Sequence, residues 1–187
     1  MGNTEQFLSS TAVKRYGRTE YYKMLGKARK GELIQVRRGI YATPEQLSGN
    51  MIDIEAIVPG GILCLWSAWN IHNLTTSAPQ AFHIAVKRDR TVTVPAFPQV
   101  EIHHYTDKIL RIGAEKMTID GFKINVYDAE RCVCDAVKFR NKVGTDVCSE
   151  IIGNYLERPE RNISKLMDYA ETLRVAAILG KYLEVKL

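Results

Sequence analysis

The sequence predicts an α+β fold with two units, a small N-terminal unit in residues 1–45 and a larger mixed C-terminal unit in residues 52–187. Two observations indicate the first unit: capping residues and glycines bracket two short helical segments, and a basic hairpin follows them. A third indicates the second unit: strand-like runs come first and helical segments follow, which is typical of an α+β domain and not of an alternating nucleotide-binding sheet.

Two helices are predicted at the start of the chain. Residues 9–17 begin on a capping serine or threonine and stop at Gly17, and residues 19–30 begin on Thr19 and stop before Gly31. The second segment has one apolar face at helical spacing, formed by Tyr21, Met24, Leu25 and Ala28. Its other face carries Thr19, Tyr22, Lys23, Gly26, Lys27 and Lys30. The one-sided lysines predict an exposed basic surface.

A hairpin is predicted directly after these helices, in the stretch GELIQVRRGIYATP. The runs LIQV and IYA read as strands, and Arg37, Arg38 and Gly39 form the tip if Gly39 takes a positive φ. Helix, glycine turn, helix and basic-tipped hairpin is the order of a winged helix-turn-helix.

The net charge lies in this first unit. Residues 1–45 hold nine Lys or Arg against four Asp or Glu, and the other 142 residues hold seventeen of each. A local positive field suits a polyanionic partner such as double-stranded DNA. The alternative is a small α+β subdomain whose lysines only face water.

The C-terminal unit is expected to combine a small antiparallel sheet with C-terminal helices, after a connector at residues 43–51. The predicted elements are a buried helix at 62–75, strands at 81–87, 91–96 and 100–106, a hairpin at 117–127 turning at Asp120-Gly121, and helices at 127–140, 145–159, 162–173 and 176–185. No apolar run approaches the roughly 18 residues of a membrane span, and the start lacks a secretion signal, so a cytoplasmic protein is expected.

No common catalytic motif is present: there is no Walker loop, GxSxG, HExxH or GxGxxG after a strand. We therefore predict no catalytic residue, metal or cofactor. His103 and His104 are adjacent on a strand and face opposite sides, so they cannot hold one metal, while His72 and His83 stand alone. The four cysteines are expected to be buried and reduced: Cys64, Cys132, Cys134 and Cys148.

Three carboxylates, Asp128, Glu130 and Asp135, keep open the alternative of a metal-dependent enzyme acting on nucleic acid. Simpler roles account for two of them. Asp128 stands where a helix N-cap belongs, and Arg131 and Asp135 have the spacing of an intrahelical ion pair.

Four stretches together resemble the AbiEi family over residues 8–160: GELIQVRRGIYATP, LWSAWNIHNLT, FHIAVKR and GFKINVYDAERCVCDAVKF. Members of this family are antitoxins and transcriptional regulators of bacterial type IV toxin–antitoxin systems. The resemblance implies a winged helix that binds and represses the promoter of its own operon. It also implies a C-terminal domain that counteracts a nucleotidyltransferase-type toxin. In one departure, only about eight residues precede Ser9, where winged helices normally have a further helix.

DNA contacts follow from this interpretation. The expected DNA-binding residues are Arg18, Thr19, Tyr22, Lys23, Lys27, Lys30, Arg37 and Arg38. The first four would lie closest to base edges, the next two would follow the phosphates, and the hairpin arginines would reach the flanking backbone or minor groove. A second hypothesis is a protein-interaction module that silences a toxin without useful DNA affinity.

Overall fold

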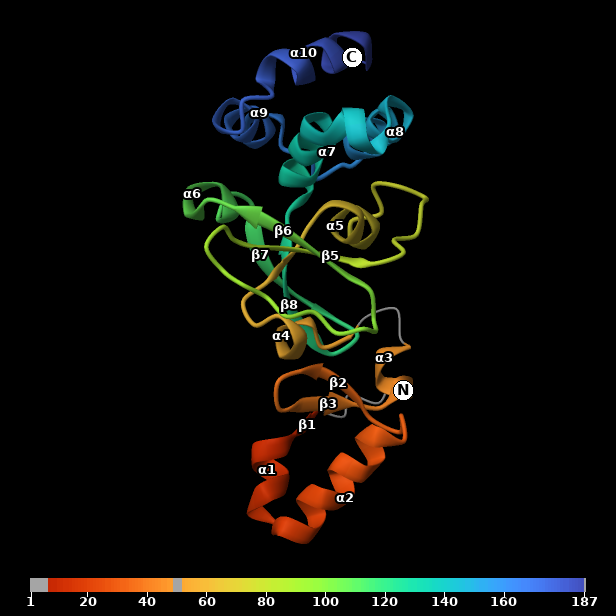
Figure 1. Ribbon diagram of the computed structural model, residues 1–187. Coiled ribbons are helices and arrows are strands. Elements are labelled where there is room, and N and C mark those ends of the chain that lie inside the picture. Colours follow the sequence, from red (N-terminus) through yellow and green to blue (C-terminus); the bar gives the residue numbers. More distant parts are fainter. Residues whose placement is uncertain (1–6, 49–51, 187) are drawn as a thin grey trace.

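The computed structural model of the chain describes residues 7–48 and 52–186, and these form a mixed α+β structure (Figure 1). Helices α1 and α2 lie at one end of an elongated molecule and the C-terminal helices lie at the other end. No helix among the described residues combines the length and the apolarity needed to cross a membrane.

The N-terminal unit is an antiparallel three-stranded sheet with two helices on one side. Its elements are β1 Leu8–Ser9, α1 Ser10–Arg15, α2 Arg18–Arg29, β2 Ile34–Arg37 and β3 Ile40–Ala42, and the strand order is β1-β3-β2. These elements are compatible with a winged helix-turn-helix. The first six residues of this predicted unit lie outside the described part of the chain.

Both predicted helices are present, but the second begins earlier than expected. Ser9 caps α1 by accepting the backbone N–H of Ala12. Gly17, and not Thr19, is the N-cap of α2, because its φ of 114° turns the chain between the two helices. The predicted apolar face of α2 packs as expected: Met24 is buried against Leu33 and Tyr41, with Tyr21, Leu25 and Ala28 around them.

The other face of the small sheet packs against the C-terminal unit. Val36 and Ala42 belong to the same buried core as Ile54 and Ile57 of α4 (Ile54–Ile57). Between the sheet and α4, the predicted connector contains a short helix, α3 (Pro44–Leu47), and its residues 49–51 lie outside the described residues. The hairpin therefore lies between α1 and α2 on one side and α4 on the other (Figure 1).

The C-terminal unit contains a five-stranded sheet in the order β6-β5-β4-β8-β7. Its strands are β4 Ile62–Leu63, β5 Phe82–Lys87, β6 Val100–Tyr105, β7 Ala114–Ile119 and β8 Phe122–Tyr127. The prediction of an antiparallel sheet is wrong, because β4 pairs with β8 and β5 pairs with β6 in parallel.

The parallel pairing has a local cause. The segment at 91–96, predicted to be a strand from its alternating Thr and Val, joins no sheet and belongs to the connection between β5 and β6. That connection carries the chain back to the level where β5 starts, so β6 runs in the same direction. The hairpin of β7 and β8 is as predicted, and Asp120 and Gly121 have the two positive φ values that a type I′ turn requires.

The remaining helices are α5 Leu65–Ile71, α6 Asp107–Leu110, α7 Ala129–Val143, α8 Thr145–Leu156, α9 Ile163–Thr172 and α10 Ala176–Lys186. The predicted helix at 62–75 is shorter than expected, because its first two residues form β4. Trp69 of α5 is fully buried and donates its indole N–H to the Cys132 carbonyl of α7, 3.0 Å away. All four cysteines are buried and unpaired, as predicted.

Candidate nucleic-acid interface

The exposed side of α2 carries the expected polar residues. Six of the eight predicted DNA-binding residues lie on this helix or directly after it, and all are exposed: Arg18, Thr19, Tyr22, Lys23, Lys27 and Lys30. Tyr22 is 66% exposed, although it is a large aromatic side chain. The sequence interpretation omitted three further exposed cations near this surface, Lys14 and Arg15 of α1 and Arg29 of α2. The sequence signal that could have identified them is their position in the last turn of a helix, where cations are favoured.

Gly26 lies at the middle of this exposed side. A Cβ at this position would have no neighbour within 4 Å. Glycine in a helix interior costs about 1 kcal/mol relative to alanine, and no contact within the described residues requires it. An open backbone here allows a partner to approach the helix closely.

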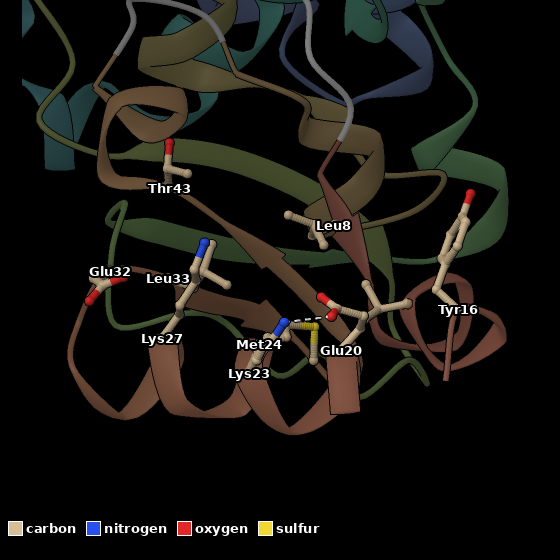
Figure 2. A pocket seen from close by; sticks show the side chains of 10 residues that line it. Leu8, Tyr16, Glu20, Lys23, Met24, Lys27, Glu32, Leu33 and Thr43 are labelled. Carbon is tan, nitrogen blue, oxygen red and sulfur yellow. Dashed lines mark hydrogen bonds and ion pairs between the residues drawn. The ribbon is translucent and has the colours of Figure 1, made fainter. Parts of the chain in front are cut away.

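Two contacts already occupy cations of the positive surface. Glu20 forms an exposed ion pair with Lys23 at 2.8 Å (Figure 2). Lys14 lies over the Tyr21 ring, 4.5 Å from its centroid. Lys27 and Lys30 have no such partner among the described contacts, so they are the more available lysines for a phosphate.

An apolar groove of about 520 Å³ runs beside α2. It is lined by ten residues, whose side chains are drawn in Figure 2: Leu8, Val13, Tyr16, Glu20, Lys23, Met24, Lys27, Glu32, Leu33 and Thr43. Every lining residue comes from the N-terminal unit, so the C-terminal unit does not cover this side. Lys23 and Lys27 are thus at the edge of the groove, whereas Arg18, Tyr22 and Arg29 share a different flank of α2 at helical spacing.

The hairpin tip is smaller than predicted. Arg38 and Gly39 form a two-residue turn in which Gly39 has a φ of 79°, as expected. The tip rests on the start of α1, because the Ser10 N–H donates to the Gly39 carbonyl at 2.8 Å. A Cβ on Gly39 would lie 3.0 Å from the Ser10 Oγ. Arg38 is exposed at this turn.

The placement of Arg37 at the tip is wrong. Arg37 is the last residue of β2, and its Nε donates to the Ala56 carbonyl of α4 at 2.5 Å. The pairing of β2 with β3 shifts between Gln35 and Arg37, and this irregularity re-aims the Arg37 side chain toward the C-terminal unit. Arg37 therefore links the hairpin to α4, and Arg38 is the exposed arginine of the pair.

The carboxylates of the enzyme alternative have structural partners. Asp128 caps α7 by accepting the Arg131 N–H at 2.8 Å, as predicted. Lys165 of α9 contacts both Asp128, at 3.0 Å, and Glu130, at 3.1 Å. Burial disfavours the charged forms of Glu130 and Lys165. The hydrogen bonds and opposite charges around them together outweigh burial, so the pKa of Glu130 is lowered and the pKa of Lys165 is raised.

Asp135 belongs to a separate, buried ion pair. Its Oδ1 accepts from the Arg131 Nε at 3.0 Å, which is the predicted ion pair, and both side chains are buried. Burial raises the pKa of Asp135 and Arg131 opposes that effect. The three carboxylates do not converge on a shared metal position in the described part of the chain.

The four histidines do not all lie as expected. His72 is buried and its Nε2 lies 2.7 Å from the Tyr127 carbonyl oxygen, as suits a core residue. The prediction that His83 stands alone is wrong. Because β5 and β6 pair in parallel, the His83 Nδ1 lies 3.0 Å from the His103 Nε2. His104 is directed elsewhere, with its Nδ1 3.4 Å from the Lys87 carbonyl oxygen.

A scan against protein-family models and a search of the curated proteins both gave no match for this chain. The functional assignment therefore depends on the geometry described above and on the motifs of the sequence.

Proposed function

We propose that the protein is a DNA-binding transcriptional regulator that acts as the antitoxin of a type IV toxin–antitoxin system. It represses its own operon and counteracts a nucleotidyltransferase-type toxin. The observation that carries the DNA-binding part is the position of α2, a helix with an exposed basic side at a free end of the molecule, next to a three-stranded sheet (Figure 1).

The connectivity supports this role for α2. Strand, helix, turn, helix and hairpin, with the first strand paired to the last, is the arrangement in which a winged helix-turn-helix presents its second helix to the major groove. Arg18, Thr19 and Tyr22 near the start of α2 are closest to base edges, and Lys27 and Lys30 follow the phosphates. Arg38 at the hairpin turn reaches the flanking backbone.

The antitoxin part is supported by the sequence resemblance alone. The run GELIQVRRGIYATP contains the hairpin, and YDAERCVCD contains the Asp128 cap and the Arg131–Asp135 ion pair. These contacts stabilise the C-terminal unit and leave the carboxylates without a catalytic role in this proposal. The toxin is thus a partner of this unit, engaged directly or through its product.

A gel-shift titration of the purified protein against the duplex upstream of its own gene tests the proposal. We expect a sequence-specific complex that an unrelated duplex of equal length does not compete away. Equal binding to both duplexes, or no binding at low salt, would contradict a regulator of its own operon.

Replacing Arg38 by Ala is expected to weaken binding similarly for all sequences and to lower the salt slope, d log K/d log[salt], by about one unit in magnitude. The reason is that an exposed guanidinium at the hairpin turn neutralises a backbone phosphate and releases its counterion. Arg88→Ala, an exposed arginine after β5, makes the same charge change away from the hairpin and serves as the control. An unchanged slope in the Arg38 variant removes the hairpin from the interface.

The apolar groove favours a second candidate, a protein-interaction module that silences a toxin without useful DNA binding. Leu8 is 40% exposed and Tyr16 is 82% exposed at this groove, which is unusual for large apolar side chains on a surface meant only for phosphates. A stable complex with the toxin, together with no upstream DNA binding at low salt, would support this candidate over the regulator.

A further inference from the structure

Three potential metal ligands meet on the paired strands β5 and β6. The His83 Nδ1 lies 3.0 Å from the His103 Nε2 and 3.5 Å from the Glu101 Oε2, and all three atoms lie within 4.8 Å of one another. Among the residues that the structure describes, no other set of three such side chains converges in this way.

The sheet register makes this arrangement a consequence of the backbone. His83 is paired with Glu101, and Ala85 is paired with His103, so Glu101 and His103 lie on one face of β6 beside His83. The Ser67 hydroxyl of α5 accepts the backbone N–H of His83 at 2.9 Å and fixes the strand at that residue. His83 itself is 8% exposed, so its ring has little freedom.

Two of the three ligand separations are close to those found at a bound transition metal. Tetrahedral bonds of about 2.0–2.1 Å from zinc to nitrogen or oxygen place two ligand atoms about 3.4 Å apart. The observed separations of 3.0 and 3.5 Å from the His83 Nδ1 differ from that value by a few tenths of an ångström. The third pair, Glu101 and His103, lies within 4.8 Å, and the Glu101 side chain is 61% exposed, so its carboxylate has room to turn toward an ion.

We propose that His83, Glu101 and His103 form a binding site for Zn²⁺ or a similar divalent transition metal, which joins the edge strand β6 to β5. Two imidazoles and one carboxylate are ligands that zinc accepts with a position left open, whereas Mg²⁺ and Ca²⁺ require mostly oxygen ligands. The site is separate from the DNA-binding surface, since it belongs to the five-stranded sheet of the C-terminal unit.

Nearby positive charge opposes a cation at this site. Lys142 of α7 acts electrostatically on His103, and its positive charge disfavours a second positive charge there. Glu101 opposes that effect, and burial lowers the pKa of His83 and of His103, which favours the neutral imidazoles that ligate metals.

Isothermal titration of chelator-treated full-length protein with Zn²⁺ tests the site, and Co²⁺ absorption in the visible range reports the coordination. We expect one site per chain. His103→Gln and Glu101→Gln should each weaken Zn²⁺ binding by at least about tenfold. A residue that only hydrogen-bonds to a metal ligand contributes about that much affinity, and a ligand itself contributes no less. Both positions are at least partly exposed, so these variants test the site without disturbing the core.

His104→Gln is the matched control, since it removes a neighbouring imidazole that faces away from the cluster. This variant should bind Zn²⁺ with the same affinity as the unaltered protein. The proposal is overturned if the unaltered protein binds no Zn²⁺, or if the His103 and Glu101 variants keep full affinity.

Discussion

Replacing Arg131 by Met is expected to lower the free energy of unfolding by about 3–5 kcal/mol, the largest effect of any single change considered for this chain. Arg131 is fully buried, and its guanidinium pairs with Asp135, donates to the Ile109 and Ile112 carbonyls, and lies 4.2 Å from the centre of the Tyr127 ring. Its removal leaves the Asp135 carboxylate buried and without a cationic partner. Chemical denaturation followed by circular dichroism measures the loss.

The double variant Arg131→Met/Asp135→Leu separates the cost of an unpaired charge from the value of the pair. A buried ion pair replaced by apolar residues of similar size is often neutral in stability, so the double variant should recover most of the loss. If the double variant is as unstable as the single variant, Arg131 stabilises the fold mainly through its contacts with the backbone and the tyrosine rings, and not through its charge.

The pH dependence of the single variant gives an independent test. Burial raises the pKa of Asp135 in the folded protein, and Arg131 is the main group that opposes this. Without Arg131 the folded pKa rises further above the unfolded value. Protonation then stabilises the folded state, so the single variant should recover stability as the pH falls from neutrality toward the ordinary pKa of aspartate, about 3.9. The double variant should lack this recovery.

Local patterns predicted the N-terminal unit well because its elements are fixed by local chemistry. The apolar spacing of Tyr21, Met24, Leu25 and Ala28 determined the buried side of α2, and Gly39 determined the hairpin turn. The direction of Arg37 could not be predicted in the same way. It depends on a shift in strand register and on a carbonyl of α4, nineteen residues away in the sequence.

The metal-ligand cluster illustrates the same limit for the C-terminal unit. His83 and His103 are twenty residues apart, and only the parallel pairing of β5 and β6 brings them together. The Thr-Val alternation at 91–96 indicated a strand there, and such a strand would have made an antiparallel meander with a different register. Strand direction depends on which segment pairs with which, and that choice is made by packing across the whole sheet.

The combined change Lys23→Ala/Lys27→Ala/Lys30→Ala is expected to have the largest effect on DNA binding. If each lysine neutralises one phosphate, the magnitude of the salt slope falls by about 2.7, and the affinity near 0.1 M salt falls roughly 500-fold. Lys23 should contribute the least when changed alone, because its ammonium is already paired with Glu20 at 2.8 Å. Fluorescence anisotropy of a labelled upstream duplex, titrated at several salt concentrations, measures both quantities.

The matched control is Lys108→Ala/Lys116→Ala/Lys123→Ala, which removes the same charge from exposed positions of the C-terminal unit. A general electrostatic attraction would weaken equally in both triple variants, because the net charge of the protein changes by the same amount. A docked α2 predicts a slope change in the first variant alone, since counterions are released only where a cation contacts a phosphate. Equal slopes in the two variants would therefore exclude α2 as the DNA-binding element, even if both proteins bind DNA more weakly.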